Sequence, residues 1–134
     1  MRGNKDLAIV TTAANNPYLV DFDGTLPSDV ADCVTGACDS PLKVAQFNIR
    51  EWLARVASDL PGARVRVCFD ETPYTAAGLA EWNCSDSGGV AVVKIGWTRQ
   101  STNAGAGGGA SNPSGLEYAV RPTVVLPLIA GSIE

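Results

Sequence analysis

The chain has 134 residues, 46 % of them hydrophobic and 18 % charged, which predicts one folded domain with a single core. Its net charge of −4 argues against a surface that attracts phosphate backbones, so no nucleic-acid partner is expected. The absence of histidine excludes serine–histidine and cysteine–histidine catalysis and most catalytic zinc sites.

Residues 1–40 are predicted to be largely irregular. The run Asn15-Asn16-Pro17 ends any helix that begins in the first dozen residues. Residues 21–40 are rich in Asp, Gly, Pro, Ser and Cys, which are typical of turns, so this part predicts a long loop.

Residues 20–26, Val-Asp-Phe-Asp-Gly-Thr-Leu, are similar to the nucleophile loop of haloacid-dehalogenase-type phosphatases. In that pattern Asp21 would attack phosphate and Asp23 would act as acid and base. The phosphatase loop, however, ends a parallel strand and is accompanied by a late acidic pair for magnesium, and neither is found here. Because Asp-Gly-Thr is common in turns, the sequence favours a turn in which Asp23 accepts backbone hydrogen bonds.

Two further ligand sites are not favoured by the sequence. The acidic residues of the first loop match no calcium-binding spacing, and the glycine run 105–109 lacks the Gly-Lys-Ser/Thr of a phosphate-binding loop. A solvated acidic loop and a flexible glycine-rich loop are expected instead, with no metal and no cofactor. The acidic residues are Asp21, Asp23, Asp29 and Asp32.

The strongest helical pattern lies in residues 41–60. Ser40 suits the N-cap and Pro41 the first helical position, and the run Leu60-Pro61-Gly62 ends the helix. Apolar residues recur at spacings of three and four, so they form one stripe. The stripe contains Leu42, Ala45, Ile49, Trp52, Leu53, Val56 and Leu60. Phe47 falls on the polar side, either as a contact with a loop or partner or as a lone exposed aromatic residue.

The second half of the chain predicts strands joined by loops. Alternating apolar residues indicate strands near 65–69 and 90–98, joined by a long connection at 70–89. A third strand is expected at 116–126, where Pro122 restricts it to a sheet edge or splits it. With no helix between them, the strands should pair antiparallel under the helix, which gives an α+β fold. The predicted core face contains Val65, Val67, Phe69, Val93, Ile95, Trp97, Tyr118 and Val120.

Four cysteines, at positions 33, 38, 68 and 84, predict disulfides and an oxidising compartment. Three pairings are possible, and Cys33–Cys38 with Cys68–Cys84 is favoured because each bond would fix a loop to a neighbouring element. The loop-entropy relation gives the second bond about 3 kcal/mol of stabilisation. A redox role and a metal site of four thiolates are the alternatives, but the spacings match neither a thioredoxin motif nor a zinc site.

Several short features follow one another over most of residues 1–99. They are Met1-Arg2-Gly3-Asn4, the loop from Cys33 to Cys38, the helix from Val44 to Trp52, Leu60-Pro61-Gly62, Gly88-Gly89 and Trp97-Thr98. In this order they resemble PilV-type minor pilins, also called type IV pilus modification proteins. Asn48 stands where that family usually has Asp, and the glycine-rich stretch at 103–115 is not typical of it.

The resemblance implies one pilin-like domain over residues 1–134. It comprises the end of the N-terminal helix and a loop at 1–40, the helix at 41–60, and antiparallel strands and loops at 64–127. The membrane helix of a pilin would be missing, since no apolar run reaches spanning length and no signal peptide is visible.

The function implied is structural, with no catalysis: a subunit of the assembly-priming or tip complex of a bacterial type IV pilus that contributes to adhesion. The implied partners are other minor pilins, the major pilin and a tip adhesin. The full-length protein would be anchored in the inner membrane, facing the periplasm, and would later lie at the tip of the extracellular pilus.

The expected interface residues lie on the helix, in the loop after the third cysteine and at the sheet edge. They are Phe47, Tyr74, Trp82 and Tyr118. The alternative function is a secreted, disulfide-bonded adhesin or ligand-binding module unrelated to pili, in which Trp82, Trp97 or Tyr74 stacks on a ligand. Phosphotransfer by Asp21 is a third hypothesis.

Overall fold

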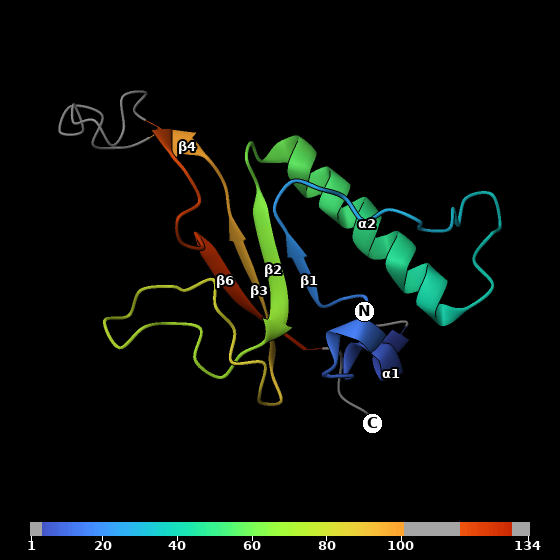
Figure 1. Ribbon diagram of the computed structural model, residues 1–134, viewed down its shortest axis with the longest axis horizontal. Helices are drawn as coiled ribbons and strands as arrows, with labels where there is room; N and C mark the ends of the chain where they lie inside the picture. Colours follow the sequence, from blue (N-terminus) through green and yellow to red (C-terminus); the bar gives the residue numbers. More distant parts are fainter. Residues whose placement is uncertain (1–3, 101–115, 130–134) are drawn as a thin grey trace.

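The computed structural model describes residues 4–100 and 116–129, and one long helix lies on a four-stranded antiparallel sheet (Figure 1). This confirms the predicted α+β class. The strand order is β1-β2-β3-β6, with β1 (Val20–Phe22), β2 (Arg64–Phe69), β3 (Ala91–Gly96) and β6 (Val124–Leu128). The remaining elements are short: α1 (Lys5–Ala8), the 3-10 helix η2 (Ala13–Asn15), and the paired strands β4 (Arg99–Gln100) and β5 (Leu116–Glu117).

The long helix α2 (Pro41–Asp59) begins where the sequence predicts and ends close to it. The Ser40 hydroxyl accepts a hydrogen bond from the backbone N–H of Lys43 at 3.3 Å, which caps the first turn. Beyond the helix the chain turns at Gly62, whose positive φ of 61° is accessible to glycine without strain. The residues of α2 that are buried against the sheet are Ala45, Ile49 and Leu53.

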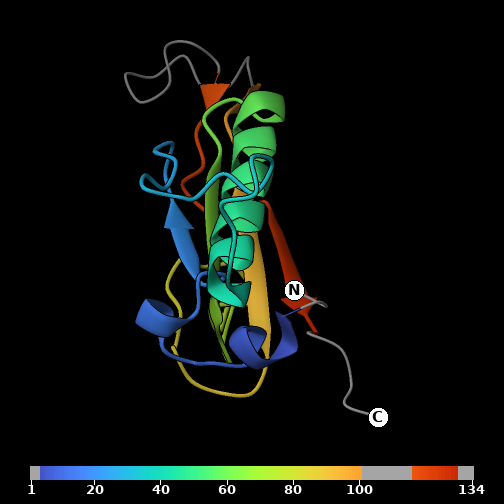
Figure 2. The same ribbon diagram turned by 90° about the vertical axis from the view of Figure 1, so that its right-hand side faces the viewer.

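The core lies between α2 and one face of the sheet. Val65 and Val67 of β2 and Val93 of β3 point into it, together with the buried residues of α2. Figure 2 views this face, with β1 on one side of α2 and β6 on the other.

Tyr118 and Val120 do not belong to this core, and their prediction as core residues is wrong. They are 65 % and 80 % exposed. The segment predicted as a strand at 116–126 is split around Pro122, so both residues lie in the connection between β5 and β6. Only from Val124 onward does the chain pair with β3.

Strand β1 overlaps the start of the segment predicted to be a long loop, so that prediction is wrong for residues 21 and 22. Phe22 is buried and pairs with Val65, which adds β1 to the antiparallel sheet beside β2. A three-residue strand with one buried aromatic residue is too short for alternation to be visible in the sequence. Asp21 therefore lies on an antiparallel edge strand, 3.6 Å from the Arg66 guanidinium, and not at the end of a parallel strand.

Residues 70–90 cross the face of the sheet opposite α2 and form a second covering layer, called here the back layer (Figure 1). Trp82 of this layer lies against Gly96 of β3, where a Cβ atom would come within 2.9 Å of the indole ring. Because Gly96 has no side chain, β3 leaves room at this position for the indole of Trp82, the largest side chain of the back layer.

Replacing Leu53 by Ala is expected to reduce the free energy of unfolding by about 2–5 kcal/mol. The Leu53 side chain is 1 % exposed, so its loss would leave a cavity between α2 and the sheet. Leu42→Ala on the same helix is the control, because Leu42 is 42 % exposed. Urea denaturation of both variants measures the difference, and equal losses of stability would contradict this placement of α2.

Candidate functional site

An apolar groove lies between α2 and the end of β6, on the core face of the sheet. Its volume is about 310 Å³, and its walls come from the segment before β1, from α2, from β2 and from β6. The lining residues are Tyr18, Asn48, Ile49, Trp52, Val67 and Leu128. The polar groups of the lining residues are the Asn48 side chain, the Tyr18 hydroxyl and the Trp52 indole N–H, and the other side chains are hydrocarbon.

The core face of β6 borders this groove and is only partly covered. The register places three apolar residues of β6 on the same face as apolar residues of β3. The pairs are Ile95↔Val124, Val93↔Leu126 and Ala91↔Leu128. Leu126 is nevertheless 52 % exposed, because β6 lies to one side of α2 (Figure 2).

A second hollow extends the apolar surface beyond the end of β6. It has a volume of about 490 Å³ and shares Leu128 with the groove. Phe69 and Val90 contribute to its walls, and the exposed Ile9 and Ile129 also line it. The groove, Leu126 and this hollow are together called the apolar strip.

Two asparagines hold the segment before β1 beside α2. Asn16 is buried, and its side chain donates to the carbonyl oxygen of Val10 at 2.8 Å and accepts from the N–H of Tyr18 at 3.0 Å. The Asn4 side chain donates to the carbonyl oxygen of Pro41, at the start of α2, at 3.1 Å. These bonds fix Tyr18 as one wall of the groove.

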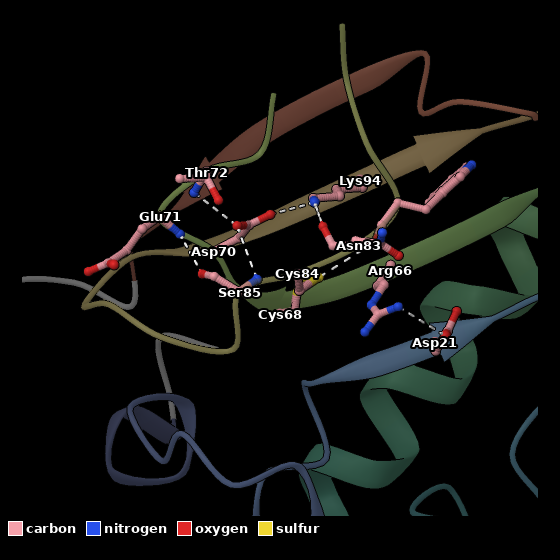
Figure 3. Close-up of a disulfide and its surroundings, with 11 residues drawn as sticks. Asp21, Arg66, Cys68, Asp70, Glu71, Thr72, Asn83, Cys84, Ser85 and Lys94 are labelled. Carbon is pink, nitrogen blue, oxygen red and sulfur yellow. Dashed lines mark hydrogen bonds and ion pairs between the residues drawn. A yellow bond between two sulfur atoms is a disulfide. The ribbon is translucent and has the colours of Figure 1, made fainter. Parts of the chain in front are cut away.

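The opposite face of the sheet is organised by a disulfide. The structure pairs Cys33 with Cys38 and Cys68 with Cys84, which is the pairing favoured from the sequence. The first bond closes the loop before α2, and the second ties β2 to the back layer (Figure 3). Two disulfides in a small domain indicate an oxidising compartment outside the cytoplasm.

A buried ion pair lies beside the second disulfide (Figure 3). Lys94 Nζ donates to Asp70 Oδ2 and to the carbonyl oxygen of Asn83, each at 2.5 Å, and both charged side chains are 0 % exposed. Asp70 Oδ1 accepts from the backbone N–H groups of Thr72 at 3.0 Å and Ser85 at 3.3 Å. Burial opposes ionisation of Asp70, but the hydrogen bonds from Lys94 and from these N–H groups outweigh it and hold the pKa of Asp70 below its ordinary value.

Trp82 is only 8 % exposed, so it is a packing residue of the back layer. Its Nε1 donates to the carbonyl oxygen of Ala119 at 3.0 Å, and the Arg64 guanidinium lies 4.4 Å from the ring centroid. Little of the Trp82 ring is therefore exposed for the ligand stacking or the interface that the sequence led us to expect.

The other residues expected at an interface do not gather on one surface. Tyr74 lies half exposed in the back layer, and Tyr118 is exposed between β5 and β6. Phe47 is half-buried on α2, which covers the other face of the sheet.

The apolar strip and the buried ion pair were not predicted from the sequence. Strand alternation places Lys94 on the face away from α2, but it does not show that residues 70–90 cover that face. The sequence does contain a signal for the pair. Lys94 is the one charged residue within the apolar strand β3, and Asp70 directly follows the neighbouring strand β2.

One group of potential metal ligands occurs within the described ranges: Cys68, Asp70 and Cys84, whose ligand atoms lie within 4.8 Å of one another. In the disulfide the two sulfur atoms are not thiolates, and Asp70 is paired with Lys94. In its oxidised form this group therefore does not offer the ligands that a metal ion needs.

No family model, curated protein or solved structure matches the chain. Within residues 4–100 and 116–129, none of the helices combines the length and the apolar character needed to cross a membrane. The function must be inferred from two features of the structure: the apolar strip on one face of the sheet and the disulfide-linked back layer on the other.

Replacing Lys94 by Met is expected to reduce the free energy of unfolding by about 3–5 kcal/mol, because Asp70 would remain buried without its counter-charge. Lys43→Met is the control, since Lys43 forms a surface pair with Asp39 and its loss should leave stability nearly unchanged. Chemical denaturation measures both variants. A Lys94→Met protein as stable as the wild type would show that the pair does not hold the back layer.

Removing the two disulfides one at a time is expected to give unequal losses of stability. Chain entropy alone predicts about 2 kcal/mol for Cys33–Cys38 and about 3 kcal/mol for Cys68–Cys84, whose sequence separations are 5 and 16. Loss of the second bond should also release the back layer, which hydrogen exchange of residues 70–90 would detect. The opposite order of stabilities would contradict this assignment.

Proposed function

We propose that the chain is the head of a structural subunit of a bacterial type IV pilus, similar to the PilV-type minor pilins. Its role is assembly and not catalysis, and its apolar strip holds the apolar helix that pilins carry ahead of their heads. Before assembly the subunit is anchored in the inner membrane with its head in the periplasm, and afterwards it lies at the pilus tip. Its partners are other minor pilins, the major pilin and a tip adhesin.

The uncovered apolar strip is the observation that carries this proposal. Neighbouring strands lie about 4.8 Å apart and a helix is about 10 Å across, so one helix cannot cover the full width of a four-stranded sheet. Strand β6 lies to one side of α2 (Figure 2), and most of the residues that line the strip are apolar. An exposed apolar surface of this kind is typical of an interaction site.

The first described residues lie close to the strip that the proposed helix would occupy. The bond from Asn4 to Pro41 holds this part of the chain at the start of α2. Ala8 and Ile9 lie near the end of β6, where they line the same hollow as Leu128. Residues 4–9 therefore run from the start of α2 to the edge of the strip.

A helix in the strip would also bury the Asn48 side chain, which lines the groove. A buried amide without a partner costs about 1–3 kcal/mol, so a polar side chain on the helix would be favoured opposite Asn48. This single polar contact would fix the register of the helix, as a buried asparagine does in coiled coils.

A secreted adhesin or ligand-binding module unrelated to pili is the second candidate function. It is favoured by the outer part of the back layer, where Tyr74 and Ala80 form an isolated antiparallel β-bridge. The side chains of Tyr74 and Leu79 are half exposed there. Trp82, one of the aromatic residues on which this function would depend, has little of its ring exposed. This function also gives no role to the apolar strip.

The pilus role predicts that deleting the gene reduces the number of surface pili in the bacterium that encodes it. The wild-type gene and Val120→Glu should restore them, because Val120 is exposed outside the strip. Leu126→Glu should restore few or none, because it would place a carboxylate beneath the helix at a cost of several kcal/mol. Electron microscopy of sheared pili measures the outcome, and thermal unfolding of both purified heads checks that they fold.

Unchanged piliation and adhesion after deletion of the gene would contradict the pilus role itself. Restoration by Leu126→Glu as complete as that by Val120→Glu would instead contradict the strip as the binding surface for the helix.

A further inference from the structure

The pair formed by Asp70 and Lys94 differs from the other ion pairs of the described residues. Those pairs, such as Lys43–Asp39 at 2.9 Å, are partly exposed on both sides. Asp70 and Lys94 are fully buried, next to the disulfide that joins β2 to the back layer. An amine nitrogen and a carboxyl group are therefore held in contact where bulk water does not compete.

The two oxygen atoms of the Asp70 carboxylate have different partners. Oδ2 contacts Lys94 Nζ, whereas Oδ1 accepts hydrogen bonds from the backbone N–H groups of Thr72 and Ser85. Two backbone donors on one oxygen form the arrangement that stabilises the negative charge of a tetrahedral intermediate in acyl transfer. The other oxygen, in contact with the nitrogen, is the one that would leave.

We propose that Asp70 and Lys94 form an intramolecular amide cross-link, with a new bond between Lys94 Nζ and Asp70 Cγ. One proton first passes from the ammonium group to Oδ2, against the hydrogen bonds that favour the ionised carboxylate, and this leaves an amine and a carboxylic acid. The nitrogen lone pair then attacks Cγ, and the negative charge collects on Oδ1. A second proton from the nitrogen joins Oδ2, which departs as water, and the third remains as the amide N–H.

The buried environment favours the amide over the ion pair. Two groups held in contact react with effective molarities that reach about 10⁵–10⁸ M in well-oriented cases. The product also replaces two buried charges, whose desolvation costs several kcal/mol each, with a neutral group. Its hydrogen-bond partners are already in place, because the amide N–H can donate to Asn83 and Oδ1 keeps its bonds from Thr72 and Ser85.

This cross-link would join the start of the back layer to β3, next to the bond between Cys68 and Cys84. A disulfide can be reduced, whereas an amide cannot, so the back layer would remain attached to the sheet under reducing conditions. The cross-link does not depend on the pilus role and would serve equally in a secreted adhesin.

The test is the intact mass of the purified protein after reduction and alkylation. We expect a mass one water molecule lower than that of the sequence with its four cysteines alkylated, and a branched proteolytic peptide that contains both Asp70 and Lys94. Lys94→Arg should have its full sequence mass, because a guanidinium group does not form this amide. Lys43→Arg, the matched control in a surface pair, should keep the loss of water.

A full sequence mass in wild-type protein with both disulfides formed would overturn the proposal, because those disulfides show that the back layer has folded. The Lys94→Arg variant also tests the main alternative source of the loss, which is dehydration at Asp23-Gly24. If Lys94→Arg lacks the same water molecule, the loss arises elsewhere and the cross-link is wrong.

Discussion

The paired strands β2 and β3 need cover on both faces, and the rest of the structure depends on that requirement. One face carries valine side chains and is covered by α2, a helix that satisfies its own backbone hydrogen bonds. The other face carries Cys68, Val92 and Lys94, all buried, yet its cover is the irregular segment 70–90. A loop of that length has little backbone pairing of its own, so side chains must hold it in place.

The side-chain ties of the back layer are therefore unusually strong for so small a domain. A covalent bond at Cys68, a buried charge pair at Lys94 and the packed indole of Trp82 follow one another along the same face of β2 and β3. The charge pair is tolerated because no buried side-chain nitrogen or oxygen in the described part of the chain lacks a hydrogen-bond partner. The contacts also restrict one another, because Asn83, whose carbonyl oxygen binds Lys94, is next in sequence to the disulfide-bonded Cys84.

Local signals made part of this structure predictable from the sequence. The Ser40-Pro41 cap and the apolar stripe act within one helix, and the strand alternation of Val65 and Val67 acts within one strand. The rest depends on contacts between distant segments. Phe22 becomes a strand residue only through its pairing with Val65, and Lys94 is buried only because a segment with no regular pattern crosses above it.

The composition of β6 indicates how a partner would contact this edge strand, either on its face or along its open edge. Residues 124–128 are all apolar, which is typical of strands covered on both faces, although Leu126 is half exposed. Pro127 has no backbone N–H to offer an incoming strand, and proline is a residue with which sheets protect their edges. The missing cover of β6 is therefore better supplied by a helix laid on its face than by a further strand added at its edge.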